Sequence, residues 1–149
     1  MEAVSAPPTP GRALGVDLGS RRIGLAVSDD RRTVATPHSV LTRSRSPADD
    51  HRAIVATARD AGATVVVVGL PLSLTGATGP AARAVLAEVD DLRAAAGPDL
   101  EVVVHDERLT TIVAEQALRE ARLRRGDRRR VVDKVAATVM LQSFLDTNA

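Results

Sequence analysis

Three acidic residues are the strongest candidates for chemistry in this chain. Asp17 ends an alternating apolar stretch, Glu107 follows a stretch rich in β-branched residues, and Asp133 lies in the first turn of the last predicted helix. Carboxylates that are brought together repel one another unless cations neutralise them, and oxygen-rich sites favour Mg²⁺ or Mn²⁺. Two such ions, about 3.5–4 Å apart, can activate a water molecule and stabilise the leaving oxygen of a phosphodiester. The pattern predicts that these three acids form a catalytic site and bind two metal ions.

Each acid also has an ordinary structural explanation. Asp17 could cap a turn, Glu107 could pair with Arg108, and Asp133 could be a charge at a helix end. For Asp133 alone the structural explanation is the better one, whereas the three acids together favour the metal site. The sequence leaves open whether Asp106 shares in metal binding.

The residues around Asp17 predict a β-hairpin. Apolar residues alternate on both sides of a turn at Gly19-Ser20, namely Leu14, Val16 and Leu18 before it and Ile23, Leu25 and Val27 after it. The hairpin places Asp17 at the end of its first strand. Glycines at positions 15, 19 and 24 remove side chains around this acid, which would let a phosphate backbone come close.

The remaining elements predict an α/β fold. We expect strands at residues 33–41, 64–70 and 100–105, with Pro37 placing the first of them at a sheet edge. We expect helices at about residues 47–61, 80–96, 110–121 and 131–145. Helical crossovers would make the last two strands parallel to the first. The prediction is a five-stranded mixed sheet, three antiparallel strands followed by two parallel ones, flanked by helices. Residues 1–11 are expected to be a disordered tail, and residues 12–149 a single domain.

Composition excludes several classes of protein. The chain has 149 residues and no cysteine, which rules out disulfides, thiolate zinc sites and cysteine nucleophiles. Phe144 is the only aromatic residue, so stacking on nucleic-acid bases is almost unavailable. The sequence has no P-loop motif, no nucleophile elbow and no metal-ligand spacing among its three histidines. It also lacks a long apolar run and a signal-peptide core, and we expect a soluble cytoplasmic protein.

Basic residues gather near the last predicted helix. Of 20 basic residues 19 are arginine, and seven arginines in residues 119–130 stand against two acids, a local net charge of +5. Arginine suits bidentate contacts with phosphate. We expect Arg128, Arg129 and Arg130, in a basic loop at residues 122–130, to hold a nucleic-acid backbone. Arg21 and Arg22 would lie on the opposite side of the site, and Arg108 is a further candidate contact.

Four motifs together resemble one family. GVDLGSRRIGLAVSD, VVVVGLPLSLTG, HDERLTT and DKVAA occur in this order, and the similarity to the YqgF or RuvX family covers about residues 12–146. The resemblance implies a ribonuclease-H-like fold and a metal-dependent nuclease. It also implies that Asp17 bridges the metals and that Glu107 and Asp133 complete the site. Members of this family are associated with maturation of the precursor of 16S ribosomal RNA and have also been assigned to Holliday junction cleavage.

The sequence departs from related patterns at two places. RuvC resolvases, which share the implied fold, carry an acid at the end of the fourth strand, where this chain has Gly69-Leu70-Pro71. Glu107, from the neighbouring strand, must substitute for that acid. The family's loop after Pro71 usually has Asn and then Asp-Gly, whereas this chain has Ser73 and Thr75-Gly76.

The resemblance leaves more than one substrate open. We favour structured RNA, in processing of the 5′ end of pre-16S rRNA during ribosome biogenesis, with branched DNA in recombination and repair as the alternative. A junction-cutting enzyme needs paired active sites, which would call for a homodimer. A non-catalytic nucleic-acid-binding regulator is a third hypothesis. An actin-like or sugar-kinase-like ATPase needs two related domains, and 149 residues are too few for both.

Overall fold

The computed structural model describes residues 10–73, 75–110 and 128–148, and all of their side chains except those of residues 109–110 and 128–133. Residues 1–9 of the expected tail, residue 74 and most of the expected 110–121 helix and 122–130 loop lie outside the described residues. None of the described helices has the length and apolar character that spanning a lipid bilayer requires.

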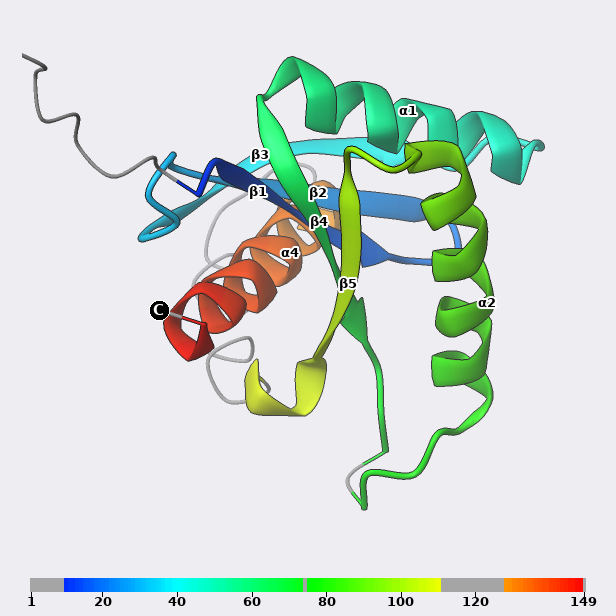
Figure 1. Ribbon diagram of the computed structural model, residues 1–149. Coiled ribbons are helices and arrows are strands. Elements are labelled where there is room, and N and C mark those ends of the chain that lie inside the picture. The colour runs from blue at the N-terminus through cyan, green and yellow to red at the C-terminus, as the bar shows by residue number, and fades with distance from the viewer. Residues whose placement is uncertain (1–9, 74, 111–127, 149) are drawn as a thin grey trace, which may run out of the picture.

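Five strands form one mixed sheet, as predicted (Figure 1). They are β1 (Arg12–Leu18), β2 (Arg22–Ser28), β3 (Ala35–Thr42), β4 (Ala63–Leu70) and β5 (Glu101–Asp106), in the order β3-β2-β1-β4-β5. The first three are antiparallel, whereas β1 pairs parallel with β4 and β4 with β5. The carboxyl ends of β1, β4 and β5 therefore meet at one end of the sheet, which we call the carboxyl edge.

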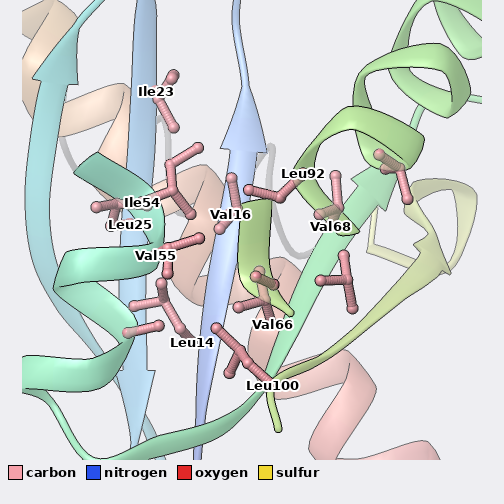
Figure 2. Packing of buried hydrophobic residues seen from close by; sticks show 14 of the residues in the cluster. Leu14, Val16, Ile23, Leu25, Ile54, Val55, Val66, Val68, Leu92 and Leu100 are labelled. Carbon is pink, nitrogen blue, oxygen red and sulfur yellow. The ribbon is translucent and has the colours of Figure 1, made fainter. Parts of the chain in front are cut away.

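Helices cover both faces of the sheet. On one face, α1 (Pro47–Asp60) and α2 (Pro80–Ala96) pack on the strands, and Figure 2 shows Ile54, Val55 and Leu92 against Leu14, Val16 and their neighbours. On the other face lies α4 (Arg128–Thr147), whose residues Ala137, Met140 and Leu141 are buried against alternate strand positions. Because β4 is buried on both faces, its valines pack alternately into the two hydrophobic cores, one on each side of the sheet.

Local chemistry explains where α1 begins and where β3 begins. Ser46 caps α1 by accepting a hydrogen bond from the Asp49 amide at 3.2 Å, and Pro47 occupies the first turn, as predicted. The third strand begins at Ala35, two residues later than expected. The Asp29 carboxylate accepts hydrogen bonds from the amides of Thr33 and Val34, at 2.6 and 3.0 Å, and so holds these residues in a turn.

The beginning of the last helix was predicted three residues too late. Arg128, Arg129 and Arg130 form the start of α4 instead of a loop, which agrees with the high helix propensity of arginine. The opposite end of α4 contacts the start of β3, because Gln142 accepts a hydrogen bond from the Ala35 amide at 2.9 Å. Residues 107–110 form the short 3₁₀-helix η1, which packs beside α4. Because β3 begins at the end of the sheet opposite the carboxyl edge, the start of α4 lies toward the carboxyl edge.

Gly15 sets the distance between α4 and the sheet. A Cβ atom at this position would lie 2.8 Å from the Leu141 Cβ and 3.3 Å from the Ala137 carbonyl oxygen. Ala137 is fully buried, and its small side chain also lets α4 lie close to β1. The backbone of β1, which carries Asp17 near its end, is thereby fixed directly against the helix that carries Asp133.

Gly15→Ala should lower the free energy of unfolding by about 1–3 kcal/mol, because the added methyl overpacks a rigid contact. Urea denaturation measures this change. Gly79→Ser is the matched control, since a Cβ at residue 79 meets nothing within 4 Å and serine is a favoured N-cap of α2. Equal stability of Gly15→Ala and the wild type would contradict this close packing.

Candidate functional site

Asp17 and Glu107 meet at the carboxyl edge. Asp17 lies near the end of β1, and Glu107 directly follows β5 at the start of η1. Both residues are half-buried, and their side chains share a hydrogen bond. The sheet thus brings together two of the three acids that the sequence singles out.

Gly69 makes this meeting possible. Strand β4 lies between β1 and β5, so Glu107 must reach across the end of β4 to contact Asp17. A Cβ atom at Gly69 would lie 2.3 Å from Glu107 Oε1. The Glu107 carboxyl group therefore occupies the space that any side chain at residue 69 would need.

Without a bound cation, Glu107 stays partly protonated at neutral pH. Burial, and then the negative charge of Asp17, raise the pKa of Glu107 from 4.5 to about 7. A divalent cation could replace that proton and neutralise both groups, and carboxylate oxygens are ligands suited to Mg²⁺ or Mn²⁺. The donor set thus fits such a metal. No group of three or more possible ligands occurs within the described residues, a search that does not include the Asp133 side chain.

Asp133 and the predicted basic contacts are placed only in part. The backbone of Asp133 lies near the start of α4, hence toward the carboxyl edge, but its side chain lies outside the described residues, as do those of Arg128, Arg129 and Arg130. Arg21 is exposed in the turn between β1 and β2, and Arg22 begins β2. Both lie at the carboxyl edge, beside Asp17.

Arg108 pairs with Asp106. Its Nε donates to the two carboxylate oxygens at 3.1 and 2.9 Å, its Nη2 donates at 2.5 Å, and its backbone amide donates at 2.9 Å. These hydrogen bonds lower the pKa of Asp106. The guanidinium also lies over Gly76 in the loop after β4, because a Cβ there would be 3.0 Å from Nη1. The Asp106 carboxylate is thus already engaged by a cation of the protein itself.

His105 connects β5 with α4. It is buried, its Nε2 lies 2.9 Å from Ser143 Oγ, and its ring meets Phe144 edge-on at 5.8 Å. Burial lowers its pKa. These contacts connect β5, which leads to Glu107, with α4, which carries Asp133.

The sequence analysis missed a charged network beside the β1–β2 turn. Arg43, directly after β3, donates two hydrogen bonds to Glu88 of α2, at 2.5 and 2.9 Å, and one to the Gly19 carbonyl oxygen at 3.0 Å. His51 of α1 also contacts Glu88, at 2.9 Å. One signal was available, since Glu88 falls at helical spacing between the buried Val85 and Leu92. A charged residue on an apolar helix stripe implies a buried partner.

The Glu107 pKa predicts a pH-dependent stability without metal. The folded protein binds one more proton than the unfolded chain between about pH 4.5 and 7. The stability that this group contributes is therefore complete at acidic pH and is lost as the pH rises to about 7. In EDTA, the melting temperature of the wild type should fall relative to that of Glu107→Gln between pH 5 and pH 8.

Glu101→Gln is the control for this experiment, because Glu101 is exposed at the opposite end of the same strand. Its melting temperature should follow that of the wild type at both pH values. If the difference in melting temperature between the wild type and Glu107→Gln does not change with pH, the raised pKa of Glu107 is wrong.

Comparisons with known proteins agree on one family. A family model described as "RuvX: Holliday junction resolvase" matches residues 11–147. A protein of Desulforudis audaxviator named "Putative pre-16S rRNA nuclease" is 43% identical over 91% of this chain and 94% of its own length. A protein of Roseiflexus sp. with the same name is 40% identical over 93% of this chain and 96% of its own.

A solved structure supports the same fold. Thermus thermophilus RuvC in complex with a Holliday junction substrate aligns with a TM-score of 0.53 and 16% identity, over 93% of this chain and 96% of that chain. At this identity the likeness concerns the ribonuclease-H-like fold alone. From the family model and the relatives at 40% identity or more, we conclude that the chain belongs to the RuvX (YqgF) family of nucleases.

Proposed function

We propose that this protein is a divalent-metal-dependent endonuclease that hydrolyses phosphodiester bonds in structured RNA, in the maturation of the 5′ end of pre-16S rRNA. The observation that carries the proposal is the Asp17–Glu107 pair, held at the carboxyl edge where the helix with Asp133 begins. The names of the relatives support the substrate. The proposal includes a cytoplasmic location, where such RNA would be processed.

Each residue has a distinct task in this proposal. Asp17, at the centre of the edge, would bridge two ions, with Glu107 and Asp133 as the outer ligands. Bound Mg²⁺ or Mn²⁺ supplies an activated water and neutralises charge on the leaving oxygen. Glu107 would release its proton when a metal ion is bound, and both of its oxygens could then act as ligands. Arg21, Arg22 and Arg108 hold the phosphate backbone on either side of the acids.

Cleavage of branched DNA is the alternative activity. The family model carries the name of Holliday junction resolvase, and the RuvC structure contains a junction substrate. A resolvase must cut two strands in a coordinated way, so this activity would require a homodimer. We favour RNA because the relatives at 40–43% identity are named for it, whereas RuvC is 16% identical. A non-catalytic nucleic-acid-binding regulator would bind these substrates without cutting them.

Asp17→Asn should abolish cleavage of an RNA that carries the 5′ precursor segment of 16S rRNA, in Mg²⁺ or Mn²⁺. The substitution removes a ligand and a negative charge while it keeps the shape of the side chain. Glu107→Gln should be nearly as inactive. Asp133→Asn should lose less cleavage activity if Asp133 binds one metal only. Asp30→Asn, exposed in the turn before β3, is the matched control.

The same assay separates the alternatives. Cutting of a four-way DNA junction but not of the RNA would support the resolvase, and binding without cutting would support the regulator.

Depletion of the protein from its source cell should cause rRNA precursors to accumulate. Full metal-dependent activity in a clean preparation of Asp17→Asn would overturn the proposed site.

The arginines at the start of α4 should bind phosphate. Each lost contact with duplex phosphate flattens the slope of log affinity against log salt by about 0.9. Changing Arg128, Arg129 and Arg130 together to Ala should therefore flatten this slope by roughly 2 to 3 and weaken binding without regard to sequence. Fluorescence anisotropy over a salt series measures both, with Arg31→Ala at the opposite edge as control. An unchanged slope would mean that these side chains do not contact the substrate.

A further inference from the structure

The turn between β1 and β2 is tightly constrained from within. The Gly19 amide donates hydrogen bonds to the Asp17 carbonyl at 3.2 Å and to the Arg22 carbonyl at 3.0 Å. A Cβ atom at Gly19 would lie 2.5 Å from the Arg22 carbonyl oxygen, so no other residue fits this shape. The turn directly follows Asp17 and carries Arg21, hence its position affects both a candidate ligand and a candidate phosphate contact.

Arg43 holds the same turn from outside. Its Nε donates to the Gly19 carbonyl oxygen at 3.0 Å, and its backbone amide donates to the Arg21 carbonyl oxygen at 2.8 Å. Two carbonyl groups of the turn are thus bound by a single residue. That residue belongs to the segment after β3, which is far from the turn in sequence but beside it at the carboxyl edge.

The guanidinium of Arg43 is itself anchored. Its other nitrogens form a bidentate pair with Glu88 of α2, and the two side chains are only 19% and 18% exposed. His51 of α1 binds the same carboxylate at 2.9 Å. Bidentate arginine–carboxylate pairs fix direction as well as distance. The turn is therefore connected through Arg43 to both helices of this face.

From this geometry we propose that Arg43 is a positioning residue of the metal site. By fixing the β1–β2 turn against α1 and α2, it sets where the Asp17 carboxylate and the Arg21 backbone lie relative to Glu107. The inference rests on the proposed function, in which Asp17 and Glu107 hold a divalent cation. Arg43 does not itself touch metal or substrate in this account, and its charge is neutralised by Glu88.

A second arginine offers a matched comparison. Arg59, near the end of α1, donates to the Ala96 carbonyl oxygen of α2 at 2.7 Å and lies 3.4 Å from Asp99. It connects the same two helices, but at the opposite edge of the sheet. Loss of Arg59 should therefore affect helix packing without moving the turn.

The experiment compares Arg43→Gln and Arg43→Lys with Arg59→Gln in the full chain. In Arg43→Gln we expect hydrogen exchange of the Gly19 amide to be at least 10-fold faster than in the wild type. Affinity for Mg²⁺ alone, followed by amide chemical shifts, should fall about 3- to 10-fold. Cleavage should show a kcat lowered roughly 10- to 100-fold and a smaller change in KM, because misplaced catalytic groups slow the bound reaction. Lysine should restore little, since it cannot bridge both Glu88 oxygens and Gly19.

Arg59→Gln should leave Gly19 exchange, Mg²⁺ affinity and kcat at wild-type values, even where its melting temperature falls as much as that of Arg43→Gln. If the three readouts follow melting temperature in all variants, Arg43 contributes to general stability and the proposal is overturned. Wild-type Gly19 exchange and Mg²⁺ affinity in Arg43→Gln would also overturn it.

Two further outcomes are covered, namely an Arg43→Gln variant that does not fold and a wild type that shows no cleavage. Should Arg43→Gln fail to fold, Glu88→Gln replaces it, because that variant removes the anchor and keeps the arginine; faster Gly19 exchange would support the proposal and unchanged exchange would oppose it. Should the wild type cut neither RNA nor junction DNA, the proposed nuclease activity fails. Exchange and Mg²⁺ titration would still decide the role of Arg43.

Discussion

The site depends on one contact between two acids that belong to non-adjacent strands. Asp17 and Glu107 share a hydrogen bond across the end of β4, and the bare backbone at Gly69 leaves room for it. Two half-buried carboxyl groups so close together raise the free energy of the metal-free protein, unless one keeps a proton. The fold tolerates this arrangement because the sheet and α4 hold both strands firmly. Such a pair is costly for stability and well suited to binding a cation.

Much of the fold could be predicted from the sequence because its signals are local. The alternation around Gly19, the valine run of β4 and the Ser46-Pro47 cap each indicate a periodicity or a cap, and the relative directions of the strands follow from the helical crossovers. Element boundaries were less predictable. The start of β3 depends on hydrogen bonds that the Asp29 carboxylate accepts, and the start of α4 depends on helix propensity in a segment that was predicted to be a loop.

The meeting of two candidate acids was predictable from the sequence, and the residues that hold the turn beside them were not. Asp17 lies near the end of one strand and Glu107 directly follows another, and both strands must end at one edge, so their meeting follows from topology. The role of Asp133 as a ligand stays a prediction. Arg43 and Glu88 are 45 residues apart, and no periodicity connects them. The Asp106–Arg108 pair likewise depends on side-chain direction, because the sequence alone also allowed Arg108 to pair with the adjacent Glu107.

The absence of a side chain at Gly69 also limits how this site could have changed over time. An acid on residue 69 and the present position of Glu107 exclude each other, because both would fill the same space. Conversion between an acid at the end of β4 and an acid after β5 thus requires two coupled substitutions. An acid added at residue 69 alone would clash with Glu107, and loss of Glu107 alone would leave the site without its second acid. A single substitution therefore cannot exchange one arrangement for the other while both side chains keep room.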